Sequence, residues 1–392
     1  MNFRTIIAGV CMFAVTSLAS AEIFTFYIAT SVGATSPSQG IYRSTLDTAT
    51  GKLSDPVLAA KAPSTSFIVI DAKGNYLYTV GNSSAPAPSG GQPAAGTPVA
   101  AVQQGAVTAY AIDKATGTLK LLNEQTSGGT NPNHLSIDRT GKVLLNGNYG
   151  SGSIQAIPIQ TNGGLGKQTG FVQHEGSSVN PQRQAGPHAH CIYASPDNRR
   201  VYVTDLGLDK TLIYRFDSTK GTFTPNNPPF AQSKPGVGPR HFIFHTSGKF
   251  LYVINEIEGS VTGYTVNASN GALTEIQTIS TFPEGYTGAT SSAEICVTPN
   301  GKFLYGSNRG NNSVAAFQVD QNTGRLTLVE METASMASPG HISIDPTGAF
   351  MLATNRTGNS ISAYRINQET GALDISGPII LVPSPSCSEF VR

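Results

Sequence analysis

The feature that most constrains the fold of this 392-residue chain is a repeated unit. A complete copy has an apolar segment, a tight Asp/Pro-x-x-Gly turn, a second apolar segment with Leu-Tyr or its equivalent, and a third segment similar to Ser-Val-x-x-Tyr/Phe. A Thr/Asn-Gly-x-Leu turn then leads to a fourth segment. The turn-bearing copies lie at residues 71–82, 138–159, 195–217, 245–273, 298–326 and 345–373. Several short strands in each copy predict the blades of a β-propeller.

The tight turns set the register of the repeat. The turn position holds Gly74, Gly141, Asn198, Gly248, Gly301 and Gly348, which are separated by 67, 57, 50, 53 and 47 residues. Glycine, and once asparagine, suits a turn position that needs a positive φ angle. A period of about 50 residues is typical of one propeller blade per copy.

A seventh unit is divided between the two ends of the chain. Segments 24–30 and 40–47 and the turn at 48–53 are expected to be a second strand, a third strand and the start of a fourth. Segment 385–391 supplies the missing first strand, because it follows a complete copy and begins like the other first strands. Pairing it with 24–30 would close the ring and remove exposed sheet edges. We therefore predict an all-β fold in which residues 22–392 form a single domain, a seven-bladed β-propeller closed by its N- and C-terminal strands.

Residues 1–21 have the pattern of a signal peptide. Arg4 precedes an apolar run at 5–18, and the segment ends in Ala-Ser-Ala, the small-x-small pattern that signal peptidase cleaves. The run is shorter than the roughly 20 apolar residues of a membrane-spanning helix. We expect an exported protein, periplasmic or extracellular, whose mature form begins near Glu22.

Segment 83–105 interrupts the second unit. It is rich in Ala, Pro, Gly and Ser and has no apolar period. We therefore predict a flexible surface loop. Because it follows Asn82 at one mouth of the propeller, we expect it to be placed where it can cover that mouth as a lid.

The charge of the chain argues against strongly electrostatic partners. It has 25 Lys and Arg against 24 Asp and Glu, a net charge of +1, so we expect it to bind neither nucleic acid nor an acidic membrane. Cys191, Cys296 and Cys387 remain after removal of the signal peptide, and this odd, widely spaced set favours buried thiols over disulfides. The sequence has no Gly-x-Ser-x-Gly motif, P-loop or Cys-x-x-Cys pair. We expect a monomer that needs no cofactor.

Two positions of the repeat place polar residues at one mouth of the central channel. They lie eight residues before the turn position, at the start of the innermost strand, and eight residues after it, at the end of the second strand. These strands form a hairpin, so both positions lie at the same end of the blade. The first position holds Ser66, Asn133, His190, Arg240, Ala293 and Gly340, and the second holds Asn82, Tyr149, Leu206, Glu256, Arg309 and Arg356. We predict that His190, Arg240, Glu256, Arg309 and Arg356 surround this mouth.

Two interpretations of the mouth are open. The rim of a propeller is usually polar, so these side chains are compatible with a solvated surface. As a group, His190, Arg240, Glu256 and Arg309 supply a base, an acid and two stabilisers of negative charge, which suits a hydrolytic site. His188, further out on the same segment, is a candidate for substrate contact.

A second set of residues lies seven positions before the turn. It contains His134, His241, Glu294 and His341, which are residue types that bind metal ions. Because these residues come from separate blades around a wide ring, we expect them to line a water-filled channel and not to converge on one ion. The candidate substrate-binding residues are His188, His241, Glu294 and Arg356.

Four segments carry a resemblance to a known family. They are 186–207, 238–256, 292–310 and 338–355, of which the GPRH…LYVINE segment at 238–256 is the most specific. Over essentially the whole mature chain, the sequence resembles the seven-bladed β-propeller lactonases. That family includes propeller-type 6-phosphogluconolactonases and the fungal carboxy-cis,cis-muconate cyclising enzyme. The resemblance implies that the functional positions are His190, Arg240, Glu256 and Arg309.

The activity expected from these residues is hydrolysis of a small carboxylated or sugar-derived lactone, or the reverse cyclisation. His190 or Glu256 would act as the general base that activates water, and Arg240 with Arg309 would hold a carboxylate and stabilise the oxyanion. This chemistry requires neither a protein nucleophile nor a metal ion. The alternative is a non-catalytic cell-envelope propeller that binds a protein or glycan partner on the same rim. A closed polar pocket would favour the enzyme, and a flat platform would favour the binding protein.

Overall fold

The computed structural model describes residues 22–32, 36–63, 65–83 and 104–392. The predicted signal peptide at 1–21 and nearly all of the predicted insert at 83–105 lie outside these residues. The described part of the chain consists of strands and turns, as predicted for an all-β protein. Within it, no helix is long and apolar enough to cross a membrane.

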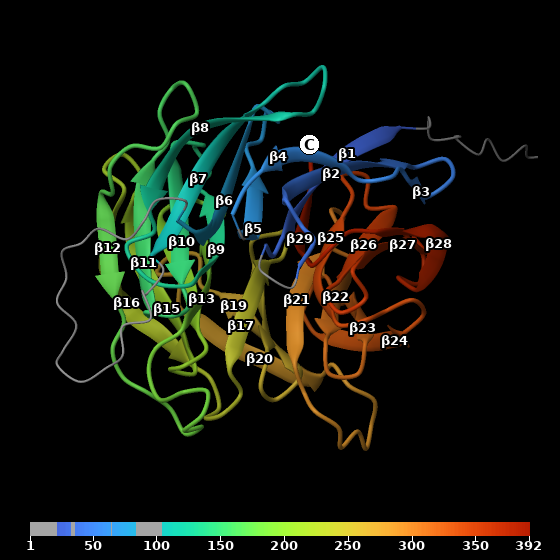
Figure 1. Ribbon diagram of the computed structural model, residues 1–392. Coiled ribbons are helices and arrows are strands. Elements are labelled where there is room, and N and C mark those ends of the chain that lie inside the picture. Colours follow the sequence, from blue (N-terminus) through green and yellow to red (C-terminus); the bar gives the residue numbers. More distant parts are fainter. Residues whose placement is uncertain (1–21, 33–35, 64, 84–103) are drawn as a thin grey trace, which may run out of the picture.

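Seven antiparallel sheets surround one central axis, and each sheet is a blade of the propeller (Figure 1). The innermost strand of each blade is followed outwards by its second, third and fourth strands. Blade 1 consists of β29 (Pro385–Phe390), β1 (Ile23–Thr30), β2 (Gly40–Asp47), β3 (Lys52–Leu53) and β4 (Val57–Lys61), the last two of which both pair with β2. Blade 2 consists of β5 (Thr65–Ile70), β6 (Tyr76–Asn82), β7 (Gly105–Ile112) and β8 (Leu119–Thr126). Blade 3 consists of β9 (Pro132–Ile137), β10 (Val143–Asn148), β11 (Ser153–Pro158) and β12 (Gly170–Gln173).

The remaining four blades follow the chain in order. Blade 4 consists of β13 (Ala189–Ala194), β14 (Arg200–Asp205), β15 (Lys210–Asp217) and β16 (Thr222–Gln232). Blade 5 consists of β17 (Pro239–Phe244), β18 (Phe250–Asn255), β19 (Ser260–Val266) and β20 (Leu273–Ser280). Blade 6 consists of β21 (Ser292–Val297), β22 (Phe303–Asn308), β23 (Ser313–Val319) and β24 (Leu326–Glu332). Blade 7 consists of β25 (Pro339–Ile344), β26 (Phe350–Asn355), β27 (Ser360–Ile366) and β28 (Leu373–Leu381).

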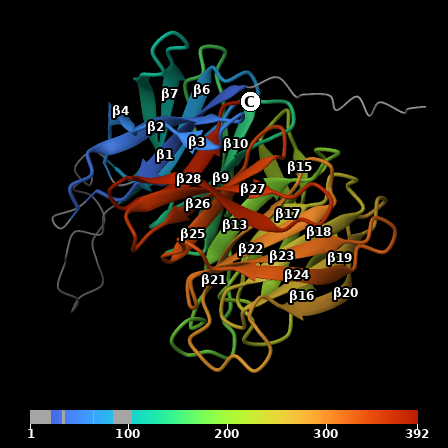
Figure 2. The ribbon, with the colours of Figure 1, turned by 90° about the vertical axis from the view of Figure 1, so that its right-hand side faces the viewer.

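The two ends of the described chain pair in blade 1, as predicted. β1 is antiparallel to β29, with Phe26 opposite Phe390 and Ile28 opposite Ser388. The two phenylalanine rings lie 5.5 Å apart between centroids. In Figure 2, β28 of blade 7 lies against β3 of blade 1, so the last complete blade packs on the composite one. The ring is therefore closed by strand pairing and by packing together.

The turn between the first and second strands has the backbone conformation expected from the sequence. The φ angle is +62° at Gly74, +60° at Asn198 and +76° at Gly348. Side chains with a β-carbon are disfavoured in this region, and asparagine is among the few that enter it. The conformation thus explains why the repeat keeps glycine or asparagine at this position.

Tyrosines of the second strands connect neighbouring blades. Each buried hydroxyl donates a hydrogen bond to the carbonyl oxygen of a glycine in the turn between the third and fourth strands of the next blade. The pairs are Tyr27–Gly117, Tyr78–Gly163, Tyr202–Gly271, Tyr252–Gly324 and Tyr305–Gly371, with O···O distances from 2.7 to 3.0 Å. The Leu-Tyr element of the repeat is therefore a contact between blades as well as a core position.

Every innermost strand has an irregularity near its first residue. In all seven blades the pairing register between the first and second strands shifts there. The shift leaves His190 without a ladder partner in blade 4, Arg240 and His241 in blade 5, and Ala293 and Glu294 in blade 6. Such bulges bend a strand and redirect its side chains. The bulges lie at the positions seven and eight residues before the turn, which were predicted to line the channel and its mouth.

Candidate active site

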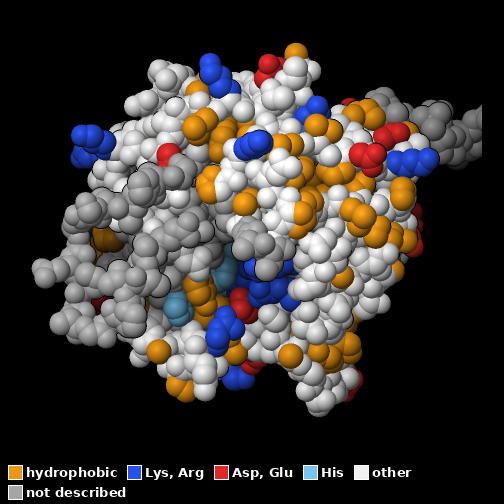
Figure 3. Space-filling view, viewed as in Figure 1, with side chains coloured by type: hydrophobic (Ala, Val, Ile, Leu, Met, Phe, Trp, Pro, Cys, Tyr) orange, Lys and Arg blue, Asp and Glu red, His pale blue; other side chains and the backbone are white. Residues whose placement is uncertain are grey.

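The bulged strand starts bring charged side chains together at one mouth of the channel. In Figure 3, surfaces of Lys or Arg, of a carboxylate and of His meet in a hollow near the centre of this face. Four of the predicted residues are largely buried there. The exposed fractions of the His190, Arg240, Glu256 and Arg309 side chains are 7%, 12%, 8% and 19%. The mouth is therefore a recessed polar cluster and not a solvated rim.

Glu256 is the centre of this cluster. Its Oε1 atom lies 2.6 Å from Nη2 of Arg183. Its Oε2 atom lies 2.9 Å from Nε of Arg240 and 3.2 Å from Nη2 of Arg309. Three guanidinium groups thus surround one carboxylate, which leaves an excess of positive charge at the mouth.

These arginines keep Glu256 ionised. Burial alone would raise the pKa of its carboxyl group, but Arg240, Arg309 and Arg183 outweigh burial and lower the pKa below its usual value. All of the close contacts to its oxygens are with cationic donors. Glu256 is therefore a weak base that holds the guanidinium groups in place.

The same crowding of charges disfavours the charged form of Arg309, whereas it favours the charged form of Glu256. Burial, followed by repulsion from Arg240, lowers the pKa of its guanidinium group to about 10, and Glu256 offsets part of this effect. The group remains protonated at neutral pH. A concentrated positive charge of this kind favours an anionic ligand.

Asn133 fixes the protonation of His190. Its Nδ2 atom lies 3.1 Å from the backbone carbonyl oxygen of His190 and 2.7 Å from Nδ1 of the same residue. Only an amide nitrogen satisfies the carbonyl oxygen, so the same NH₂ group donates to Nδ1 and the imidazole proton lies on Nε2. Burial, Arg240 and His241 lower the pKa of His190 well below its usual value. His190 is therefore neutral and presents an N–H group, 3.8 Å from Oε2 of Glu256.

One wall of the mouth contains His188, a predicted substrate contact, together with Tyr149 and Arg183, for which the sequence predicted no role. Tyr149 stacks on His188 with ring centroids 4.4 Å apart, and its hydroxyl lies 3.4 Å from Nη2 of Arg183. Nδ1 of His188 bonds to the carbonyl oxygen of Tyr149 at 2.8 Å. Tyr149 occupies the same repeat position as Glu256, so the register of the repeat could have identified it as a residue of the mouth. Arg183 lies in the connection between β12 and β13, outside the repeat, so the register gave no indication of it.

Arg356 differs from the other predicted arginines. Its side chain is exposed, and no hydrogen bond or ion pair joins it to Glu256 among the described residues. Its charge contributes to the lowered pKa of Arg309. Arg356 thus lies at the outer edge of the cluster.

Below the mouth, the residues seven positions before the turn, His134, His241, Glu294 and His341, form a packed inner layer. The expectation of a wide channel that keeps these residues apart was wrong. Nδ1 of His241 lies 2.9 Å from both carboxylate oxygens of Glu294, and Nε2 of His341 lies 3.4 Å from Oε2. The ring of His134 lies 5.1 Å from that of His241, and Phe67 packs on His134 at 4.5 Å between centroids. Side chains from separate blades therefore meet on the axis and fill it. Within the described ranges, no three His, Cys, Asp or Glu residues are arranged to hold a metal ion.

The cysteines are free thiols, as predicted. Cys191 and Cys387 are buried, and Cys296 is partly buried. Sγ of Cys191 lies 3.5 Å from Nε2 of His134, and Sγ of Cys387 lies 3.4 Å from Nε2 of His341. Burial raises the pKa of both thiols well above the usual value, so they are packing groups and not nucleophiles.

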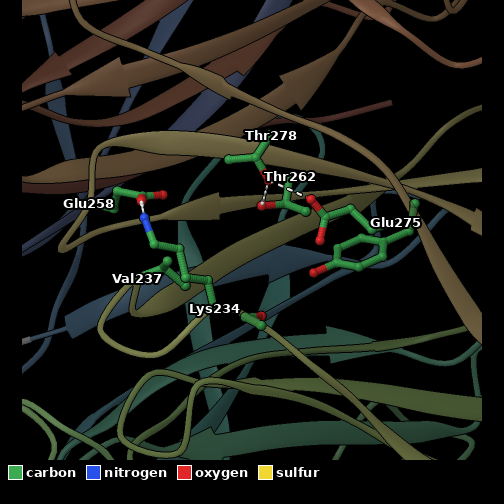
Figure 4. A pocket seen from close by; sticks show the side chains of 8 residues that line it. Lys234, Val237, Glu258, Thr262, Glu275 and Thr278 are labelled. Atoms are coloured by element: carbon green, nitrogen blue, oxygen red, sulfur yellow. Dashed lines mark hydrogen bonds and ion pairs between the residues drawn. The ribbon is translucent and has the colours of Figure 1, made fainter.

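A separate cavity of about 200 Å³ lies on the outer strands β19 and β20 (Figure 4). Five of its polar side chains are paired with one another. Lys234 bonds to Glu258 at 2.7 Å, and Thr278 bonds to Thr262 and to Glu275 at 3.0 Å each. Because these groups satisfy one another, we place the candidate active site at the channel mouth.

Comparison with known proteins identifies the family. The model of the family described as "Lactonase, 7-bladed beta-propeller" matches residues 25–390. The chain is 34% identical over 294 residues to a 6-phosphogluconolactonase of Bacillus subtilis, covering 75% of this chain and 77% of the relative. It is 33% identical over 273 residues to a 6-phosphogluconolactonase of Formosa agariphila, covering 68% and 71%.

A solved structure agrees with this assignment. The periplasmic gluconolactonase of Pseudomonas aeruginosa superposes with a TM-score of 0.85 at 26% identity, covering 95% of this chain and 99% of that one. The match extends over all seven blades and so includes the mouth. The chain therefore belongs to the seven-bladed β-propeller lactonases, enzymes that hydrolyse lactones.

Proposed function

We propose that this protein hydrolyses a small lactone that carries a carboxylate or phosphate group, at the mouth formed by blades 3 to 6. The observation that carries the proposal is the surplus of positive charge around Glu256, where Arg183, Arg240 and Arg309 face a single carboxylate. Two relatives are named 6-phosphogluconolactonases, whose name implies a phosphorylated sugar lactone. A carboxylated lactone, including one derived from a sugar, fits the same charge.

Arg240 and Arg309 are assigned to substrate binding and to the oxyanion. A lactone carbonyl gains negative charge when water attacks it, and a buried cation or donor stabilises that charge more strongly than an exposed one. Both side chains are largely buried. Arg183 has a side chain that is 41% exposed, so we assign it to the anionic substituent at the outer side of the site.

The contacts support a different division of roles from the one expected for His190 and Glu256. Glu256 carries a lowered pKa and is held by three arginines, so it orients them and does not take the proton from water. His190 presents Nε2–H, so it donates a hydrogen bond to the carbonyl oxygen as charge develops there. Tyr149 and His188 are assigned to a stacking wall beside the substrate.

The reaction direction follows from the substrate supplied. Hydrolysis and lactone formation pass through the same transition state, so groups that stabilise one stabilise the other. In water the ring-opened acid is the product we expect for most unactivated lactones.

A panel of lactones tests the proposal. Purified protein is incubated with γ- and δ-lactones that carry carboxylate, phosphate or no charged group, and acid release is followed by titration. We expect turnover of at least one anionic lactone and slower turnover of its neutral counterpart. No hydrolysis across the panel would contradict the proposal and favour the non-catalytic binding protein, with a protein or glycan partner on the same rim.

We propose further that the protein is exported and acts as a monomer in the periplasm or extracellular medium. The support is the signal-peptide pattern of residues 1–21 and the similarity to a periplasmic gluconolactonase. N-terminal sequencing of the exported protein should start near Glu22, and a soluble cytosolic form that keeps Met1 would contradict export. Light scattering of the purified protein measures the oligomeric state.

A further inference from the structure

The inner layer contains an imidazole nitrogen that nothing in the described part of the chain satisfies. Nε2 of His241 is buried and has no hydrogen-bond partner among the described residues. A buried polar atom without a partner costs free energy, so such atoms are uncommon and are often found where function requires them. The other nitrogen of the ring, Nδ1, lies 2.9 Å from both oxygens of Glu294.

The hydrogen bonds around Glu294 decide which nitrogen of His241 carries the proton. The backbone N–H of Ile295 donates to Oε1 at 3.0 Å. The backbone N–H of Ser388 approaches Nδ1 of His341 at 3.4 Å, so His341 carries its proton on Nε2, which faces Oε2 of Glu294. An ionised carboxylate only accepts hydrogen bonds, so Nδ1 of His241 is the donor in its contact with Glu294. Nε2 of His241 is then an unprotonated base.

The neighbouring histidines have the opposite tautomer. Asn133 donates to Nδ1 of His190, and the backbone N–H of Ile192 donates to Nδ1 of His134 at 3.3 Å. Both therefore carry their proton on Nε2, like His341. His188, which is only partly buried, also carries its proton on Nδ1, because that nitrogen bonds to the carbonyl oxygen of Tyr149. Among the buried histidines of the mouth and the inner layer, His241 is the one that presents a lone pair without a donor.

We propose that His241 is the general base of the hydrolysis and that Glu294 is the residue that positions it. This inference rests on the function proposed above. His241 and Arg240 are displaced by the same bulge at the start of β17, and the ring of His241 meets that of His190 edge-on at 5.0 Å between centroids. The base thus lies next to Arg240 and His190, two of the groups assigned to the oxyanion. A carboxylate that fixes the tautomer and orientation of an imidazole is the arrangement that histidine bases require.

The step balances with the residues named. Nε2 of His241 takes a proton from water, and the water oxygen forms a bond with the acyl carbon while Arg240 and His190 stabilise the oxyanion. The bond between the acyl carbon and the ring oxygen then breaks, and the proton on His241 passes to that oxygen. The product is a hydroxy acid, whose carboxyl proton is released to solvent, and His241 returns to its neutral form.

Two variants test the assignment with the lactone turned over best by the wild type. We expect His241→Gln to lower kcat by about 10²- to 10⁴-fold, the range for loss of a general base, with KM changed less than about threefold. Glu294→Gln should lower kcat by a smaller factor, because Nδ1 keeps an acceptor while the charge that supports the imidazolium is lost. His134→Gln is the matched control, since Nδ1 of this inner-layer histidine already accepts from the backbone N–H of Ile192, and its kcat should stay within about threefold of the wild type.

The outcomes separate this inference from the proposed function. If the wild type hydrolyses no lactone, the proposed function fails. If the wild type is active and the folded His241→Gln variant retains its kcat, the base assignment alone is overturned. Chemical rescue adds a readout that a structural role would not move: His241→Gly should regain turnover when imidazole is added, and His134→Gly should not respond.

The tautomer is also measurable in the unaltered protein, which covers the case of variants that do not fold. Long-range ¹H–¹⁵N NMR spectra of ¹⁵N-histidine-labelled protein distinguish Nδ1–H from Nε2–H imidazoles. We expect Nδ1–H for His241 and Nε2–H for His134, His190 and His341. A proton on Nε2 of His241 at neutral pH would overturn the proposal.

Discussion

Arg240 joins two blades through Ala293, because Nη1 of Arg240 in blade 5 donates a 2.6 Å hydrogen bond to the carbonyl oxygen of Ala293 in blade 6. Its Nε atom at the same time donates to Glu256 at 2.9 Å. A lysine ammonium offers its donors from a single nitrogen, so it does not reproduce the two-nitrogen contact that Nε and Nη1 of Arg240 make with acceptors on two blades. We therefore expect Arg240→Lys as well as Arg240→Ala to lower kcat for an anionic lactone by roughly 100-fold, as for a lost oxyanion donor, measured by initial rates.

Arg356→Ala is the comparison for this prediction. Arg356 occupies the repeat position of Glu256 and Arg309 but is exposed and does not contact Glu256. Its removal should change turnover far less than the Arg240 substitutions do. Equal losses for Arg240→Ala and Arg356→Ala would mean that the general positive charge of the mouth, and not the buried donor, supports the reaction.

Glu256 should make stability depend on pH in a defined window. Its pKa in the folded protein lies below the ordinary value of 4.5, so the stabilisation is complete above that value and is lost as the pH falls through the folded pKa. Glu256→Gln leaves three guanidinium groups without their carboxylate, of which those of Arg240 and Arg309 are largely buried, and should cost about 3 kcal/mol at pH 7. Urea unfolding from pH 7 to pH 3 should show this difference shrinking below pH 4.5.

Glu369→Gln serves as the control for the pH series, because Glu369 is exposed. Its unfolding free energy should follow that of the wild type at every pH. A Glu256→Gln difference that stays constant down to pH 3 would show that the carboxylate is not the titrating group.

The hydroxyl of Tyr252 should stabilise the boundary between blades 5 and 6. It donates to the carbonyl oxygen of Gly324 at 2.8 Å, and both groups are buried. Tyr252→Phe leaves that carbonyl without its partner and should lower the free energy of unfolding by about 1–3 kcal/mol. Tyr286→Phe, whose hydroxyl bonds to Ala289 at an exposed site, should change it by only a few tenths of a kcal/mol.

Deletion of residues 385–392 should destabilise the whole ring. It removes β29, which supplies Phe390 and Cys387 to the core and pairs with β1 along its length. The loss exposes the edge of β1 and separates blade 1 from its innermost strand. Deletion of Arg392 alone keeps β29 and is the control, and calorimetry should show a clearly lower Tm for the longer deletion only.

The repeat made the fold and part of the site predictable. Glycine and asparagine at the turns fixed the register, and the register placed His190, Arg240 and Glu256 at one mouth, where the structure has them. Asn133 and Tyr149 stood in the same register, but nothing in a single sequence says that an amide will reach the imidazole of the next blade. Their partners depend on the distance between blades, which a periodic pattern does not encode.

The inner layer was mispredicted for a physical reason. The expectation of a wide channel rested on these residues coming from separate blades around a ring, and it took no account of the bulges at the strand starts. In a regular strand, side chains alternate across the sheet. The bulges break that alternation, so His241 and Glu294 turn toward the axis and meet. Arg183 lies in a connection of irregular sequence, and its place against Glu256 depends on the path of that connection.

Closure through β1 and β29 sets the order in which the ring can be completed. Of the strands described in the propeller, β1 is synthesised first and β29 last. The hydrogen bond from Ser386 of β29 to Thr65 of β5, in the neighbouring blade, spans 321 residues of the chain. Blades 2 to 7 each consist of strands that are consecutive in the chain, so they can form as the chain emerges. Blade 1 has to wait with an open edge until every other blade has been made. The joining of the ring is therefore a late, long-range step, and it is the stage of folding at which the chain is most exposed to pairing with another copy of itself.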